Sequence, residues 1–179
     1  GGYRGWTLFE GGLDTEPSYG TWGIAPGGRT IDPGQLVFDF FGGIDVAEFS
    51  PGLPHSYTAT DGKFTALQLQ NGPQTHRMFQ DIALPARATT ISWDMEYNNH
   101  SGEFVPDAQV LEVNVRDASS DAILATLFRT TQGVNPPVIP VTHFSRDVSA
   151  FGGRTVRIVV DMTVHRFYFD PAFAHFKFD

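Results

Sequence analysis

The sequence contains no cysteine, and basic residues are scarce in it: 12 Lys and Arg stand against 20 Asp and Glu, for a formal net charge of -8. The lack of cysteine excludes disulfide scaffolds, thiolate metal sites and cysteine nucleophiles. The few basic residues are scattered, whereas proteins that bind nucleic acid or anionic membranes carry basic patches. We therefore expect neither partner, and the charge balance favours cations over anions as ligands.

Long apolar runs are also missing, so the sequence predicts no membrane-spanning helix. No secretory or transit segment is visible, and we expect the chain to be a mature form or an excised domain. No two of the six His stand at a close ligand spacing, which leaves no local zinc signal. The Gly-x-Ser-x-Gly nucleophile elbow and a strand-to-helix phosphate loop are absent as well.

Alternation of apolar and polar residues is the dominant pattern that is present. Over residues 155–165 every second residue is Val, Ile or Met, which predicts a strand with one buried face. Residues 167–178 follow with six aromatic side chains and no helical pattern, which predicts the closing strand of an all-β domain. The rest of the chain is expected to be built around these two segments.

Further strands are predicted between Gly- and Pro-rich turns, which include a turn at Gly11-Gly12 and a Pro-rich loop at 133–140. Residues 1–62 hold fourteen of the 19 Gly and predict loops around two or three short strands, with one helical turn at 45–49. Residues 121–129 fit both helical and strand spacing, and the hairpin-like turn at 117–121 favours a strand. The predicted strands cover 6–9, 36–41, 64–69, 77–84, 89–97, 110–115, 121–129 and 141–148.

These patterns predict an all-β fold in a single domain, 1–179: a two-sheet antiparallel β-sandwich of the jelly-roll type. The predicted core consists of inward-facing residues of the most regular strands, namely Ile91, Trp93, Leu111, Val113, Ile158, Val160 and Met162.

Several segments, in this order along the chain, resemble the galactose-binding-like β-jelly-roll family. They read FEGG and GTW at residues 9–12 and 20–22, DGKFTAL and FQDI at 61–67 and 79–82, DVSAFGGRTVRI at 147–158, and FYFD at 167–170. The sequence departs from that family at two places. The family often has a second acidic residue after the closing-strand Asp, whereas Pro171 follows Asp170 here, and the segment 22–61 is longer than the family's usual loop. The resemblance implies a carbohydrate-binding module or accessory domain of a larger exported bacterial protein, secreted or at the cell surface. Its expected partner is a polysaccharide or glycan.

The resemblance also implies a structural calcium ion. The family's metal ligands match Glu10, Asp61 and Asp170 in this sequence. Calcium takes six to eight hard oxygen ligands, so three carboxylates with loop carbonyls would suit it. The alternative is that Asp61 caps a turn and Asp170 bonds to backbone.

A glycan site requires aromatic rings beside amides and carboxylates. Two loop regions offer them. The candidate ligand-binding residues are Tyr19 and Trp22 in the first third, and Tyr97, Asn98, Asn99 and His100 after the strand at 89–97. The alternative for the rings is packing in the core or in a loop.

An enzyme that acts on polysaccharide is the second hypothesis, and a structural or adhesive surface domain is the third. Two carboxylates about 5–9.5 Å apart can hydrolyse a glycosidic bond. The candidates are the outward-facing acids Asp94, Glu96, Glu112 and Asp161, with Arg157 or His165 as helpers in a lyase. Outward acids on a sheet are more often simply solvated.

Overall fold

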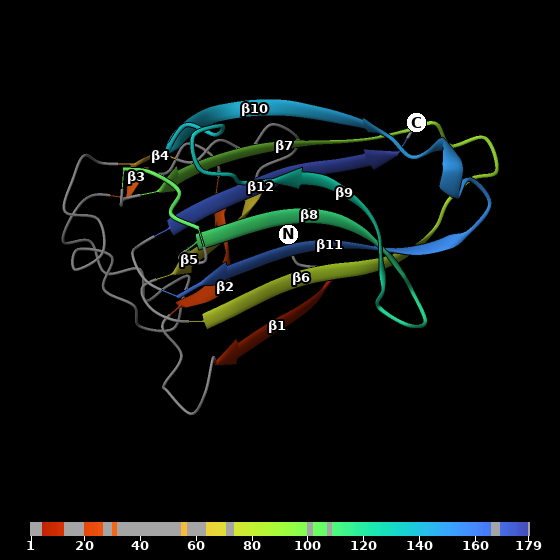
Figure 1. The fold of residues 1–179 in the computed structure, drawn as a ribbon, viewed down its shortest axis with the longest axis horizontal. Coiled ribbons are helices and arrows are strands. Elements are labelled where there is room, and N and C mark those ends of the chain that lie inside the picture. Colours follow the sequence, from red (N-terminus) through yellow and green to blue (C-terminus); the bar gives the residue numbers. More distant parts are fainter. Residues whose placement is uncertain are drawn as a thin grey trace.

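The computed structural model describes residues 5–12, 20–26, 30–31, 55–56, 64–70, 74–99, 102–106, 109–165 and 169–178. These residues form two five-stranded antiparallel sheets and a two-stranded ribbon, as Figure 1 shows. The predicted two-sheet antiparallel sandwich is thereby confirmed. The only helical element in the described segments is a 3-10 turn, η2, at Ser149–Phe151. The described residues contain no helix long and apolar enough to cross a membrane.

Sheet A has the strand order β1-β6-β11-β8-β9, and sheet B has the order β10-β7-β12-β5-β2. The strands of sheet A are β1 (Thr7–Gly12), β6 (Gln74–Ala83), β11 (Thr155–Val164), β8 (Gln109–Asp117) and β9 (Ile123–Arg129). Those of sheet B are β10 (Val138–Asp147), β7 (Thr90–Asn99), β12 (Phe169–Phe178), β5 (Phe64–Gln70) and β2 (Gly20–Pro26). The ribbon pairs β3 (Thr30–Ile31) with β4 (His55–Ser56).

The last two strands, β11 and β12, are the central strands of their sheets. Strand β11 pairs along its whole length with β6 on one side and β8 on the other. Strand β12 pairs with β7 from Phe169 to Phe178, with a register shift between Ala174 and Lys177, and with β5 from Phe169 to Phe173. The C-terminal segment that carries the strongest alternation in the sequence is therefore the part against which both sheets assemble.

Apolar side chains from the facing sides of the two sheets form the core. All seven predicted core residues are fully buried in it. Trp93 stacks on Phe144 with ring centroids 5.4 Å apart, and Phe128 meets the same ring edge-on at 5.3 Å. These contacts join β7 and β10 of sheet B to β9 of sheet A and close the sandwich along that side.

Some predicted boundaries were wrong. The Gly11-Gly12 pair, expected as a turn, continues β1 and pairs with Thr75 and Gln74. Residues 133–140 were expected to be loop, yet β10 begins at Val138 and includes Pro140. A proline is tolerated there because β10 is an edge strand and its register with β7 shifts between Ile139 and Thr142.

Other predictions agree with the structure or fall outside it. The ambiguous run at 121–129 is a strand, β9, and the preceding turn connects β8 to β9 in a hairpin. Strand β2 was not predicted as a strand; it pairs with β5 at the edge of sheet B. The predicted strand at 36–41 and the helical turn at 45–49 lie outside the described residues.

Candidate functional site

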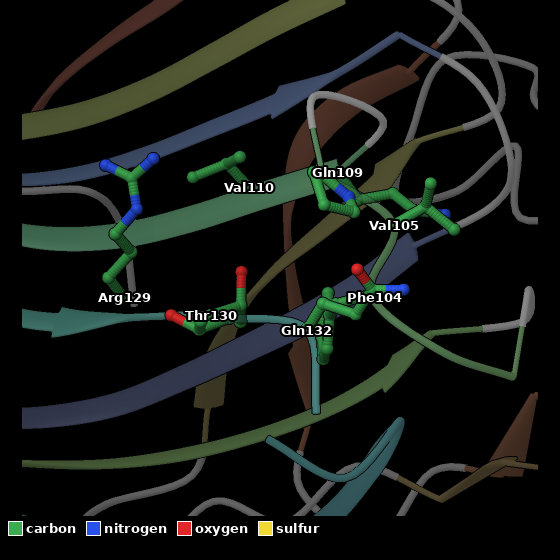
Figure 2. Close-up of a pocket in the computed structure, with 9 residues that line it drawn as sticks. Phe104, Val105, Gln109, Val110, Arg129, Thr130 and Gln132 are labelled. Atoms are coloured by element: carbon green, nitrogen blue, oxygen red, sulfur yellow. The ribbon is translucent and has the colours of Figure 1, made fainter. Parts of the chain in front are cut away.

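A groove of about 330 Å³ opens at one end of the sandwich, where β8 begins and β9 ends. Figure 2 shows Arg129 and Thr130 at the end of β9, Val110 on the adjacent strand β8, and Phe104 and Val105 in the preceding loop. The full lining consists of Phe104, Val105, Pro106, Gln109, Val110, Arg129, Thr130, Thr131 and Gln132. Apolar carbon surface and hydrogen-bonding groups therefore lie side by side in one open depression.

Local pairing explains how the groove is built. The backbone N–H of Thr130 donates to the Leu111 carbonyl at 3.0 Å, and the Leu111 N–H donates to the Thr130 hydroxyl at 3.0 Å. This exchange extends the β8–β9 ladder past the last strand residue of β9. The chain then turns away, so that Thr131 and Gln132 stand exposed at the rim. Arg129 is half exposed at the same rim and pairs with Glu112 of β8.

Asn99 ties together the two loops beside the groove. Its Nδ2 donates to the Glu103 carbonyl at 2.9 Å, and its Oδ1 accepts from Gln109 Nε2 at 3.3 Å. The backbone N–H of Asn99 donates to the Pro137 carbonyl at 2.8 Å. Asn99 is 2% exposed. This residue was predicted to bind ligand, but it is buried and is not among the residues that line the groove. Its hydrogen bonds instead hold the neighbouring loops together.

Tyr97 was expected as a ring for sugar stacking, but the structure places it in the core, 1% exposed. It packs edge-on against Phe104 with centroids 5.5 Å apart, and its hydroxyl donates to the Pro136 carbonyl at 3.0 Å. Burial raises the pKa of Tyr97 to about 12, against a smaller lowering by a hydrogen bond with Asn135. The ring supports the groove through Phe104 and offers no face to a ligand.

The other predicted ligand-binding residues are not brought to the groove by the described structure. Asn98 and Trp22 occupy positions in β7 and β2, opposite Asp170 and Gln68 respectively. Tyr19 and His100 lie outside the described residues. Their part in binding stays a prediction.

The candidate catalytic carboxylates fall on two different faces of the sandwich. Asp94 and Glu96 alternate with core residues of β7 and lie on the other face of sheet B, where Glu96 is buried and not exposed as predicted, whereas Glu112 and Asp161 are register partners on the outer face of sheet A. The four therefore do not face one substrate as a set.

Three of these carboxylates are engaged by basic side chains. Asp94 Oδ1 lies 2.7 Å from His143 Nδ1, and Glu112 pairs with Arg129. Asp161 Oδ2 accepts from Arg77 at 2.7 Å and from Arg116 at 3.1 Å. Of the two predicted helpers, Arg157 pairs with Asp81, and His165 is exposed after the end of β11.

The predicted calcium ligands lie on separate elements. Glu10 is in β1 of sheet A opposite His76, Asp170 is in β12 of sheet B, and Asp61 lies outside the described residues. Among the side chains that the structure describes, no three His, Asp or Glu come together as a metal site. The calcium ion stays a prediction.

Sequence reasoning named none of the residues that line the groove as ligand-binding candidates, although its candidates at 97–100 stand shortly before the lining residues 104–106. The polar loop after the strand at 89–97 supplies Phe104 to Pro106. The partner segment Thr130–Gln132 belonged to a stretch interpreted only as the end of a strand and a Pro-rich loop. Its Thr-Thr-Gln sequence, of which Thr131 and Gln132 are exposed, is a weak signal, because only the pairing of β9 with β8 brings it beside residues 104–106.

No protein-family model matches the sequence, and no curated protein is similar to it. Comparison with solved structures finds 40 similar chains. One is the enzymatically active domain of tailspike protein 4 of bacteriophage CBA120 (10% identity, TM-score 0.46); the match covers 99% of this chain and only 19% of the tailspike chain.

Two other similar structures are an adhesin domain and a carbohydrate-binding module. The K1 cleaved adhesin domain of Lys-gingipain from Porphyromonas gingivalis is 10% identical with a TM-score of 0.45, over 97% of this chain and 98% of that one. The family 11 carbohydrate-binding module from Clostridium thermocellum, solved with a β-1,3-1,4-mixed-linked tetrasaccharide, is 7% identical with a TM-score of 0.46, over 99% and 89%. Because these values are low and the three proteins differ in function, we draw no functional conclusion from them.

Proposed function

We propose that this protein is a non-catalytic carbohydrate-binding module and that a glycan binds in the groove between residues 104–106 and 129–132. One observation carries the proposal: the groove sets the apolar surface of Val105, Pro106 and Val110 beside the exposed polar groups of Thr131 and Gln132. A sugar ring presents the same combination of apolar C–H faces and hydroxyls, and ligand sites match such surfaces with a few placed polar groups. The sequence resemblance to galactose-binding-like jelly rolls supports the same function.

The resemblance further supports a role as an accessory domain of an exported bacterial protein. In that setting the module would hold a larger protein on its polysaccharide. An enzyme that uses the outward carboxylates is the rival hypothesis. The ion pairs of Glu112 with Arg129 and of Asp161 with Arg77 and Arg116 favour the module, because a carboxylate held by a permanently charged guanidinium is a poor proton shuttle.

The test is a panel of polysaccharides assayed for retention in an affinity gel and for release of sugar ends. We expect retention without release. Thr131→Ala and Gln132→Ala remove hydroxyl and amide groups from the rim, and the loss of one hydrogen bond of about 1 kcal/mol should weaken binding about fivefold.

Thr126→Ala is the matched control, because it is the same substitution at an exposed position of β9 that does not line the groove. Binding that neither rim variant weakens would place the glycan elsewhere. Release of sugar ends that disappears in Glu96→Gln or Glu112→Gln would establish an enzyme instead.

A further inference from the structure

Three arginines on the outer face of sheet A converge on a single carboxylate. They come from three adjacent strands: Arg77 from β6, Arg157 from β11 and Arg116 from β8. Their Nη1 atoms lie 2.9, 3.2 and 3.2 Å from the carboxylate oxygens of Asp121. Each guanidinium is largely covered, with side-chain exposures of 25%, 20% and 11% in the same order.

Two carboxylates of the sheet, Asp81 and Asp161, compensate two of the three arginine charges. Arg157 and Arg116 are register partners in β11 and β8, and like charges directly opposite one another are unfavourable. Asp81 and Asp161 occupy other atoms of the three arginines. The third charge is compensated by Asp121, whose carboxylate accepts from the Nη1 groups of all three arginines.

Asp121 reaches this place from the turn between β8 and β9, not from the sheet. Asp121 has a backbone φ of +59°, and it is the one non-glycine residue in the described chain with a left-handed backbone. Burial opposes ionisation, but the hydrogen bond from Arg157 and the charges of Arg77 and Arg116 lower the pKa of Asp121. The exposed β8–β9 hairpin thus places an ionised carboxylate against the three arginines.

Two further features of this face fit an external anion. Arg116 Nε is a buried donor with no hydrogen-bond partner among the described residues, so the donors of the cluster are not all satisfied by Asp81, Asp121 and Asp161. Phe9 of β1 is the register partner of Arg77 and is 52% exposed. An apolar ring therefore lies open beside the arginine cluster.

We propose that Arg77, Arg116 and Arg157 form a binding site for the carboxylate or sulfate group of an acidic sugar, and that Asp121 fills this site in the free protein. Planar guanidinium groups suit carboxylate and sulfate oxygens, and the Phe9 ring would lie against the sugar. The ligand displaces the hairpin carboxylate. The sugar part of the proposal rests on the proposed function, whereas the oxyanion site does not.

The test uses Asp121→Asn, which keeps the shape of the side chain and removes its charge. Two other contacts of the hairpin go to backbone, from Arg157 to the Ala118 carbonyl and from Arg116 to the Asp121 carbonyl, and these remain. If the hairpin leaves the site in about a tenth of the molecules, the variant should bind trigalacturonate about tenfold more tightly than the parent. Calorimetric titration measures this, with sodium sulfate as the probe for a free oxyanion.

Asp147→Asn is the matched control, since it changes the net charge equally at an exposed position on β10. Binding gained by Asp121→Asn, absent in Asp147→Asn and lost again when Arg157→Gln is added, supports the site. No gain, or an equal gain in the control, overturns it.

Hydrogen exchange of the unaltered protein provides a measurement that does not depend on a variant folding. Trigalacturonate should speed exchange of the amides at 118–122, while neutral galactotriose should leave them unchanged. Unchanged exchange with saturating trigalacturonate would also overturn the site. Loss of binding to neutral glycans in the groove variants is a separate result and leaves this one untouched.

Discussion

At the scale of single residues, the described part of the core holds a buried ionisable side chain, His76. His76 of β6 faces the core beside Met162 and is fully buried. Neither ring nitrogen has a hydrogen-bond partner among the described residues. Burial lowers the pKa of His76 to about 3, because a charged imidazolium in this position would lose its contact with water.

This environment predicts acid sensitivity. In the unfolded chain the imidazole gains its proton near pH 6.5, whereas in the folded protein it stays neutral until about pH 3. The stability that His76 contributes is complete above pH 6.5 and is lost as the pH falls towards 3, by about 1.4 kcal/mol per pH unit.

The measurement is urea unfolding at several pH values between 7 and 4. His76→Met, an apolar replacement of similar volume, should flatten the decline by about that slope. His165→Gln alters an exposed histidine and serves as the control. An equal decline in the parent and in His76→Met would show that another group is responsible.

At the scale of elements, the turn from η2 to β11 connects sheet B to sheet A and depends on close backbone contact. The N–H of Gly153 donates to the Leu84 and Pro85 carbonyls, both at 3.2 Å, and the Leu84 N–H donates to the Arg154 carbonyl at 2.9 Å. Gly153 has a φ of +77°. A Cβ on Gly152 would stand 2.8 Å from the Ala86 carbonyl oxygen. The η2–β11 turn can therefore pack against the backbone at Pro85 and Ala86 only if position 152 lacks a side chain.

Gly152→Ala should therefore destabilise the protein by about 1–3 kcal/mol, the usual range for an overpacked position. For a chain of this size, each 1 kcal/mol lowers the melting temperature by about 2–4 °C. Thermal unfolding followed by circular dichroism measures it. Ala150→Gly, in the exposed part of the same turn, should cost about 1 kcal/mol or less. If Gly152→Ala melts at the same temperature as the parent, the close contact between Gly152 and Ala86 does not contribute to stability.

At the scale of the whole molecule, the family resemblance predicts that calcium joins distant parts of the chain. The expected ligands belong to β1 in one sheet, to β12 in the other and to the segment before β5. An ion that binds only the folded state stabilises it by RT ln(1 + [L]/Kd), which is about 2.7 kcal/mol at a hundredfold excess over Kd.

We expect the melting temperature to rise with free calcium and to fall with a chelator. Asp170→Asn should remove the calcium response, whereas Asp147→Asn should keep it. If the melting temperature is the same in chelator and in millimolar calcium, the folded protein does not bind a stabilising calcium ion.

The sequence by itself determined which side of each regular strand is buried. Side chains of a strand alternate between two faces, so Ile91 and Trp93, or Val160 and Met162, could be assigned to the core without knowing which strands pair. The same local rule predicted the strands β7, β8 and β11. Tyr97 follows it as well, since it is in phase with Trp93, and its interpretation as a ligand ring gave too much weight to its place at the strand end.

Only the tertiary structure decided which residues meet. Strand pairing joins segments far apart in the chain, such as β6 and β11, and alternation contains no information about partner or register. The groove requires residues 104–106 and 129–132 to lie together, and the arginine site requires Arg77, Arg116 and Arg157, from three neighbouring strands, to reach the same carboxylate. A net charge of -8 gave no sign of that cluster, because composition averages over the surface whereas register concentrates like charges at one point.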